Sequence, residues 1–326
     1  MTPIGGARTL RLVIALLLSS LGTAPVVGAQ ELAHRTLAPG VQMLSGGPDG
    51  NVLVVDGADA RLVVDGQAPG RADVVLAAID ELEGPPVRWV VNTHFHEDHR
   101  GLNAALAERG ATVVSHREAR ALMQRGETIE DIGWTLTAAP AEALPGLVTA
   151  GDLTLHLGGM TVRLLHMPAA HTAGDLAVYV PEADVILAGD VFELGAWPFL
   201  DLWHGGTVDG LVAAADRLLE IAGDDTVIVP GHGPPSDRAT VARWRDVIVG
   251  LRDKVDVAIA AGQTYVEFAD SAPTRAWDDR WGGAAGGRRL AIFAFVERSR
   301  VQQGRSADGD PSEQAGEAEA SGAQDH

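Results

Sequence analysis

One short polar segment restricts what this chain can fold into more than any other, because it places four potential metal ligands directly after an apolar strand. The predicted strand covers Val87–Asn92. Residues two apart in an extended segment point the same way, so His94 and His96 share one direction. Asp98 continues that row, and His99 turns away as a helix begins. A solvated polar loop would explain one or two of these residues but not four. The spacing therefore predicts ligands for two metal ions, two of these residues for each.

Three later residues stand in a similar context, each shortly after an apolar segment that reads as a strand. They are His171, Asp190 and His232. A polar side chain just past a buried strand lies where α/β folds place functional groups. Each of the three alone would be explained as a hydrogen-bonded structural residue, but together with the first cluster they indicate a metal site. Since the chain has no cysteine, the ligands of that site must be His nitrogens and carboxylate oxygens.

The two ends of the 326-residue chain read as separate segments. Residues 1–29 carry two arginines, an apolar run and then small residues, which is typical of a secretory signal peptide with cleavage after Ala29. A membrane anchor is the alternative, but the apolar run is well short of the roughly 20 residues that a span needs. Residues 302–326 have six carboxylates and no large apolar residue, which predicts a disordered acidic tail. Residues 30–301 are then expected to form one domain of a periplasmic or secreted protein.

Composition limits the partners of this chain. It has 44 acidic against 25 basic residues and a formal net charge of −19. Nucleic-acid binding relies on clustered Lys and Arg, so we expect no nucleic acid partner. We also expect no stable membrane insertion once the signal peptide is removed. A small-molecule substrate is the expected partner, and the sequence leaves the oligomeric state open.

Between the two ends, short β-branched runs bounded by turn residues predict strands, and apolar residues at helical spacing predict helices. Both halves of the chain follow this order, which predicts an α/β (α+β) fold with two sheets and helices outside them. The segment 128–147 has two prolines and no sustained period, so we expect a loop there. The predicted helices lie within residues 70–84, 100–108, 117–125, 208–222 and 239–255.

The order of these polar residues resembles the H-x-H-x-D-H signature of the metallo-β-lactamase fold superfamily, which is followed by a lone His, an Asp and a His. The resemblance covers nearly all of residues 41–268. It implies a four-layer αββα sandwich of two mixed β-sheets, with a dinuclear zinc site between the sheets at one edge. It also implies that Asp190 bridges the two ions and that Asp65 orients a ligand. The ligands that it implies are His94, His96 and His171 for the first ion, and Asp98, His99 and His232 for the second.

Nitrogen and carboxylate ligands suit Zn²⁺, although iron or manganese also binds such sites. Two adjacent ions lower the pKa of a bridging water toward neutrality. The resulting hydroxide is expected to attack a carbonyl or phosphoryl centre while one ion polarises the oxygen that gains charge. Asp98 is the expected catalytic residue, because it is placed to orient the hydroxide and take up a proton. Such hydrolysis needs no protein nucleophile, which is consistent with the absence of cysteine.

The bridging Asp190 narrows the resemblance within the superfamily. One β-lactamase class uses a Cys at that position and a nearby Lys for the substrate, whereas the only lysine here, Lys254, lies in a C-terminal helix. The pattern is similar to glyoxalase II, lactonase and phosphodiesterase relatives, and to exported bacterial members. It implies cleavage of a lactone, ester, thioester or, weakly, a β-lactam. The alternatives are a mononuclear iron sulfur-compound dioxygenase and, less favoured, a zinc-binding carrier. The complete set of seven ligands favours the hydrolase.

The loop that follows Asp190 carries several aromatic residues. We interpret Trp203 and His204 as candidates for a wall that faces the substrate, with ordinary packing as the alternative. Phe199, in the same loop, is expected only to pack. His116 stands at the start of a predicted helix, so we expect it to cap that helix or support the site without binding a metal.

Overall fold

The computed structural model describes residues 32–307. The expected signal peptide, residues 1–29, lies outside the described residues, and so does the part of the expected tail, 302–326, that follows residue 307. The strands are β1 (Ala33–Ala38), β2 (Val41–Ser45), β3 (Val52–Asp56), β4 (Arg61–Val64), β5 (Val87–Val91), β6 (Thr112–His116), β7 (Glu127–Ile129), β8 (Trp134–Leu136), β9 (Leu147–Thr149), β10 (Leu153–His156), β11 (Thr161–Met167), β12 (Asp175–Val180), β13 (Val185–Leu187) and β14 (Val227–Val229). The helices are α2 (Ala72–Asp80), α3 (Asn103–Glu108), α4 (Arg117–Gln124), α5 (Val208–Ile221), α6 (Arg238–Ala260), α7 (Tyr265–Asp270) and α8 (Gly283–Ala307).

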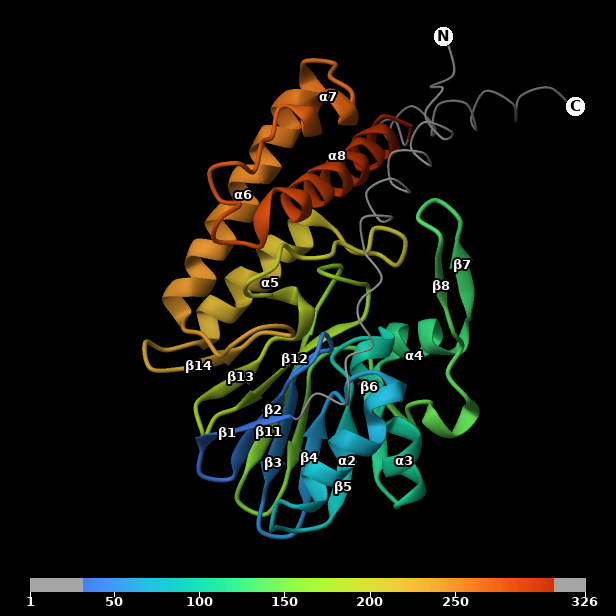
Figure 1. Ribbon diagram of the computed structural model, residues 1–326, viewed down its shortest axis with the longest axis vertical. Helices are drawn as coiled ribbons and strands as arrows, with labels where there is room; N and C mark the ends of the chain where they lie inside the picture. Colours follow the sequence, from blue (N-terminus) through green and yellow to red (C-terminus); the bar gives the residue numbers. More distant parts are fainter. Residues whose placement is uncertain (1–31, 308–326) are drawn as a thin grey trace, which may run out of the picture.

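Two mixed sheets form the centre of the molecule (Figure 1). The first sheet has the strand order β1-β2-β3-β4-β5-β6-β9, antiparallel from β1 to β4 and parallel from β4 to β9. The second has the order β10-β11-β12-β13-β14 and is antiparallel except for the parallel pair β13 and β14. Strands β7 and β8 pair only with each other, as a separate hairpin. Parallel neighbours end at the same edge of a sheet, which later decides where the polar residues meet.

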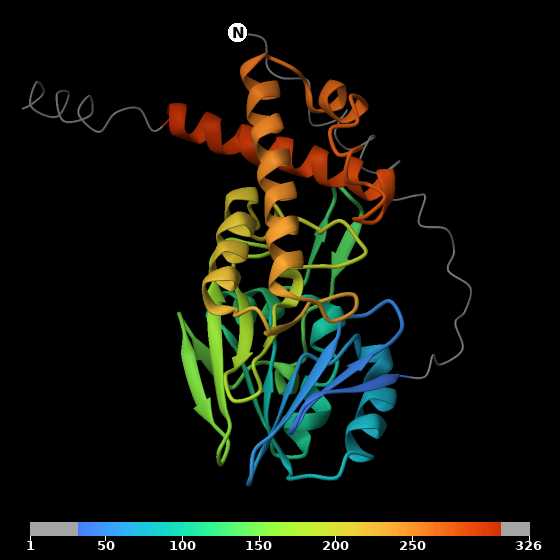
Figure 2. The same cartoon turned by 90° about the vertical axis from the view of Figure 1, so that its left-hand side faces the viewer.

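Three apolar layers hold the elements together, and strand alternation assigns each side chain to its layer. On β4, Leu62 and Val64 belong to the core between the two sheets, whereas Val63 packs with residues of α2 and α3 on the outer face. On the other side of the second sheet, Ile186 and Ile228 pack with α5, α6 and α8. Figure 2 shows α6 and α8 crossing over that side of the molecule. The layers run helix, sheet, sheet, helix, which confirms the predicted αββα sandwich.

The segment 128–147, which we expected to be a loop, contains the β7–β8 hairpin and the edge strand β9. The prediction was wrong because each of these strands has only three residues, too few to show an alternating pattern. In Figure 1 the hairpin extends away from the two sheets. A residue of β8 contributes to the site described below.

Helices α7 and α8 were not predicted, and α8 continues through Ala307, past the boundary expected at residue 301. Helix α8 contains six consecutive buried residues, 290–295, so its sequence has no polar face at that point from which a helical period could be read. Arg298 of α8 forms a two-fold ion pair with Asp256 of α6, which ties the C-terminal helix to the fold. Within residues 32–307, no helix is both long and apolar enough to span a membrane.

Candidate metal centre

The strand order brings the polar segments of both halves to one edge of the sandwich. Strands β4 and β5 are parallel neighbours, so Asp65 and the histidine segment leave the first sheet together. Strands β13 and β14 are also parallel neighbours, so Asp190 and His232 leave the second sheet together. A hydrogen bond from the Leu176 amide to the Thr93 carbonyl, 2.7 Å long, joins the two sheets at this edge. The polar residues therefore meet between the sheets, as expected.

The first group of potential ligands is His94, His96, His171 and Asp190, whose ligand atoms all lie within 4.8 Å of one another. His171 Nε2 lies 3.0 Å from His96 Nδ1. Asp190 Oδ2 lies 3.8 Å from His94 Nε2 and 3.7 Å from His171 Nε2. All four side chains are buried. Three imidazole nitrogens and one carboxylate oxygen thus face a common centre.

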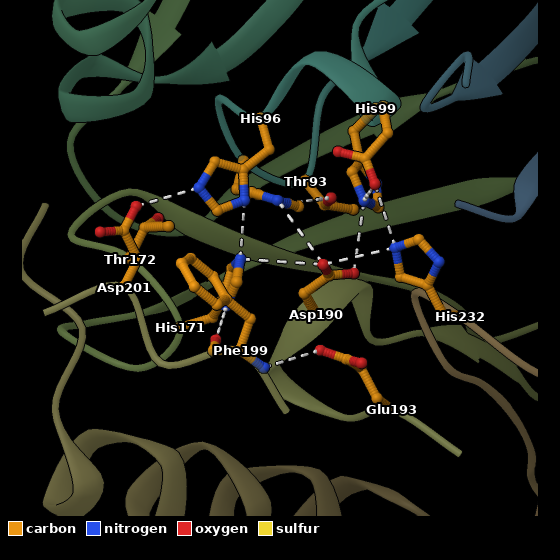
Figure 3. A network of polar contacts seen from close by, with 12 residues as sticks. Thr93, His96, His99, His171, Thr172, Asp190, Glu193, Phe199, Asp201 and His232 are labelled. Carbon is orange, nitrogen blue, oxygen red and sulfur yellow. Dashed lines mark hydrogen bonds and ion pairs between the residues drawn. The ribbon is translucent and has the colours of Figure 1, made fainter. Parts of the chain in front are cut away.

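The second group is Asp98, His99 and His232, again with ligand atoms within 4.8 Å of one another. Asp98 Oδ2 lies 3.2 Å from His232 Nε2 and 3.6 Å from His99 Nε2. Asp190 also reaches this group, because its Oδ1 lies 3.4 Å from His99 Nε2 and its Oδ2 lies 3.5 Å from His232 Nε2. Figure 3 shows Asp190 between His171 on one side and His232 on the other. The structure therefore brings together all seven predicted ligands and places Asp190 between the two groups.

Asp65 fixes the orientation of two of these histidines. Its carboxylate is fully buried, and its Oδ2 accepts hydrogen bonds from His99 Nδ1 and Thr93 Oγ1, each 2.8 Å long. Its Oδ1 accepts the Thr93 amide, also at 2.8 Å. The Thr93 hydroxyl in turn accepts from His94 Nδ1 at 3.1 Å. When the rings are neutral, the protons of His99 and His94 are thereby held on the outer nitrogens, and the inner nitrogens present lone pairs to the centre.

The other two buried histidines are oriented from the loop after Asp190. His96 Nε2 donates to Asp201 Oδ2 at 3.0 Å, and His171 Nδ1 donates to the Phe199 carbonyl at 2.6 Å (Figure 3). Sequence reasoning missed both partners. The available signal for Asp201 was an Asp between two leucines in an otherwise apolar stretch, whereas a backbone carbonyl leaves no signal at all. These bonds again leave the inner nitrogens free to bind a cation.

Three buried atoms at this centre have the chemistry of metal ligands. His94 Nε2, His99 Nε2 and Asp190 Oδ1 are all buried without a hydrogen-bond partner. A buried polar atom left without a partner costs about 1–3 kcal/mol. Imidazole nitrogens and carboxylate oxygens are the donors that zinc and similar divalent ions accept. The residues present therefore fit divalent metal ions in both groups.

The electrostatics of the two groups differ. Burial lowers the pKa of His94 well below its usual value and that of His171 to about 4, helped by the charges of neighbouring histidines. In the second group burial lowers the pKa values, but the charges and hydrogen bonds of Asp190 and Asp98 together outweigh it. They raise the pKa of His99, which Asp65 also raises, well above its usual value and that of His232 to about 10. Burial likewise raises the pKa of Asp190, but the charges of His99 and His232 hold it well below its usual value. Without a metal, the raised pKa values therefore favour the protonated, positively charged forms of His99 and His232.

Two glycines are required by close approach of the chain to these groups. A Cβ atom at Gly231 would lie 1.8 Å from Asp190 Oδ1, and one at Gly50 would lie 2.5 Å from His99 Cε1. Side-chain carbons do not approach other atoms so closely, and neither neighbour is free to move because each faces the centre. The turn before His232 and the loop before β3 can therefore pass the site only as glycine.

Trp203 and His204 do not form the expected wall. The ring of Trp203 packs edge-on against Phe293, with the ring centroids 5.3 Å apart. His204 is buried, donating from Nδ1 to Asp201 Oδ2 at 2.6 Å and from Nε2 to Glu127 Oε1 at 3.1 Å. Both side chains are held by partners away from the cavity, since Phe293 lies on α8, Glu127 lies on β7 and Asp201 lies in the same loop. His204 therefore supports Asp201, the residue that orients His96, and does not line the cavity beside the ligand groups.

A cavity of about 1040 Å³ opens beside the ligand groups. Its aromatic lining is formed by Phe199, which we expected only to pack, and by Trp134 of the hairpin. The Trp134 ring lies 5.2 Å from the ring of His96 and 5.5 Å from the ring of Phe199. Glu193 and Arg289 also line the cavity. Sequence reasoning missed Trp134, because its strand was read as a loop, and Arg289, which lies on an unpredicted helix.

His116 caps α4, as one of the two expected readings had it, by accepting a hydrogen bond from the Glu118 amide at 3.4 Å. Its ring stacks on that of His166 with a centroid separation of 4.0 Å. Burial lowers the pKa of both rings. Neither residue belongs to the ligand groups.

The comparison with known families agrees with this geometry. The family model described as the metallo-beta-lactamase superfamily matches residues 45–232, more than half of the chain. This chain belongs to the metallo-β-lactamase superfamily. The matched residues contain all seven potential ligands, whereas Arg289 and the helices α6 to α8 lie outside them.

Curated relatives are similar over part of their length. The probable metallo-hydrolase YqgX of Bacillus subtilis is 28% identical over 51% of this chain, and a hydroxyacylglutathione hydrolase of Polaromonas sp. is 29% identical over 52%. The chain covers 66% of the first relative and 58% of the second, which is less than two thirds of either.

Solved structures confirm the fold. A metallo-beta-lactamase from Pontibacter korlensis superposes with a TM-score of 0.54 at 20% identity, over 67% of this chain and 98% of that one. The sec-alkylsulfatase Pisa1 from Pseudomonas sp. superposes with a TM-score of 0.60 at 18% identity, over 80% of this chain and 50% of that one.

Proposed function

We propose that this chain is a dinuclear zinc hydrolase that cleaves a carbonyl-centred bond of a small molecule, in a lactone, ester, thioester or, weakly, a β-lactam. The observation that carries the proposal is the position of Asp190 between the two ligand groups. Its Oδ2 lies 3.7 Å from His171 Nε2 of the first group and 3.5 Å from His232 Nε2 of the second. Bound zinc ions polarise a carbonyl oxygen and lower the pKa of a water toward neutrality. We assign the first ion to His94, His96 and His171, the second to Asp98, His99 and His232, and Asp190 to both.

Asp98 is the residue of this chain that we assign to proton transfer. Its side chain is 35% exposed and lines the cavity, whereas Asp190 is buried. Burial raises the pKa of Asp98, but the charge of His99 and the hydrogen bond from His232 outweigh it and hold the pKa well below its usual value. The carboxylate is therefore ionised at neutral pH. It accepts a proton from the attacking water and returns it to the leaving group.

The surroundings support a partly apolar substrate. Trp134 and Phe199 offer ring surface beside the ligand groups, and such surface binds the apolar part of a ligand while it excludes water. The relatives named as a probable metallo-hydrolase and as hydroxyacylglutathione hydrolases support hydrolysis of an acyl compound. The signal-like pattern of residues 1–29 supports a periplasmic or secreted location.

The experiment that tests this function combines elemental analysis with a panel of chromogenic ester, lactone, thioester and β-lactam substrates. We expect two zinc ions per chain and turnover that a chelator abolishes and zinc restores. His94→Ala should lose metal and turnover, whereas the matched control His156→Ala, on an exposed strand position, should retain both. One iron per chain without hydrolysis would indicate the dioxygenase instead. A protein that holds no metal tightly would contradict the ligand assignment.

A further inference from the structure

Arg289 of α8 stands apart from the other charged residues near the centre. It lines the cavity, and its guanidinium carbon lies 5.9 Å from the centroid of the Phe199 ring. The Phe199 ring in turn lies 6.1 Å from the ring of His96 and 6.3 Å from that of His171. One aromatic ring therefore separates the arginine from the metal ligands.

The guanidinium of Arg289 makes few hydrogen bonds although the side chain is half-buried. Its Nε atom is buried without a hydrogen-bond partner, and Nη2 makes one long bond, 3.4 Å, to the Trp197 carbonyl. Two other arginines of the same helix differ, since Arg288 donates to Asp270 at 2.8 Å and Arg298 forms an ion pair with Asp256. A half-buried charge that forms no ion pair loses part of its hydration without compensation. Arg289 thus has the capacity to bind an anion that the described residues do not supply.

The nearest carboxyl group does not fill this role. Glu193 also lines the cavity, but its Oε1 accepts the Phe199 amide at 3.3 Å and forms no ion pair with Arg289 among the described residues. The second cation of the cavity lining, Arg35, is exposed, so water screens its charge.

We propose that Arg289 binds a carboxylate of the substrate, so that the cavity selects acyl compounds that carry an acid group several bonds away from the bond that is cleaved. The apolar linker of such a compound lies along Phe199, between the guanidinium and the metal ligands. Arginine binds carboxylates with two parallel hydrogen bonds, and these are strong where water is excluded. This inference rests on the proposed function for the reacting bond, but not for the binding of the anion.

The binding arm of the test uses two probes that differ in one group. Adipamic acid carries one carboxylate, and adipamide carries a neutral amide in its place. By calorimetry we expect adipamic acid to bind the full-length wild-type protein at least about 10-fold more tightly than adipamide. Arg289→Met should lower the affinity for adipamic acid about 10- to 100-fold, and Arg289→Lys should lower that affinity less. The control is Arg288→Met, because the neighbouring Arg288 donates to Asp270. It should leave the affinity for adipamic acid unchanged.

The kinetic arm uses the 4-nitrophenyl half-ester of adipic acid and the corresponding ester with a terminal amide. Arg289→Met should lower kcat/KM for the acidic ester about 10- to 100-fold and alter the neutral ester less than about 3-fold. Equal binding of the two probes by the wild type, or unchanged binding of adipamic acid by Arg289→Met, would overturn the inference. If the binding of adipamic acid depends on Arg289 but neither ester is cleaved, the anion site is supported and the proposed hydrolysis is contradicted.

Discussion

Asp65→Asn is the substitution that most directly tests how the second ligand group is held. Asp65 adopts a left-handed backbone with φ of 60°, a conformation that Asn tolerates, so the change removes charge without adding strain. In the wild type, the Asp65 carboxylate accepts hydrogen bonds from Thr93 and His99. In the variant, the amide oxygen still accepts hydrogen bonds, but the NH₂ group is itself a donor and faces one of these donors. The least costly response is for His99 to move its proton from Nδ1 to Nε2, the atom that faces the centre. That proton then occupies the position of the metal.

The expected loss of zinc affinity follows from the hydrogen bond that Asp65 accepts from His99. Removing the hydrogen-bond partner behind a ligating histidine typically lowers metal affinity about 10- to 100-fold, which corresponds to about 1.4–2.7 kcal/mol. Only one of the two sites should weaken by this full amount, because His96 and His171 are held by other groups. Competition with chromophoric chelators resolves the two zinc affinities and is the appropriate assay.

Asp184→Asn is the matched control. Asp184 also has a left-handed backbone, with φ of 51°, and also accepts a threonine hydroxyl, that of Thr226 at 2.7 Å, but it contacts no potential ligand. It should lose some stability and leave both zinc affinities unchanged. If Asp65→Asn folds and binds both ions with wild-type affinity, the proposed orientation of His99 is wrong.

Other measurements test the remaining features. Because the pKa values of His99 and His232 are raised, both rings carry protons at pH 7 without metal, so zinc binding should release about two protons, seen as a dependence of the binding enthalpy on the buffer. No buffer dependence would contradict this. The lowered pKa of His166 means that the unfolded chain takes up its proton first as pH falls, so stability drops below about pH 6.5. His166→Phe should lose less stability between pH 7.5 and 5.5 than the wild type in urea unfolding. Trp134→Ala should lower kcat/KM for aromatic esters about 10-fold, whereas Trp203→Ala, outside the cavity, should lower stability and leave kcat/KM within about 2-fold.

Sequence patterns were sufficient to predict the ligands, because the same arrangement, a polar residue after an apolar strand, recurs along the chain. The histidine segment after β5 and the later residues Asp190 and His232 follow apolar strands, and strand ends converge because parallel strands run the same way. Patterns were insufficient where an element is short or buried on all sides. The three residues of β8 could not reveal that Trp134 faces the site, and the continuous burial of residues 290–295 concealed α8 and with it Arg289.

The sequence by itself determined the family, the αββα layering and the set of residues able to bind metal, because residue type and spacing decide which atoms can coordinate and which strand faces are apolar. Only the tertiary structure decided what surrounds that set. Asp201, the Phe199 carbonyl and Arg289 come from segments that lie 100 or more residues after the histidine segment in the chain and that folding brings to the centre. Their positions follow from packing between elements, which depends on side-chain contacts across the whole fold and leaves no local pattern in the chain.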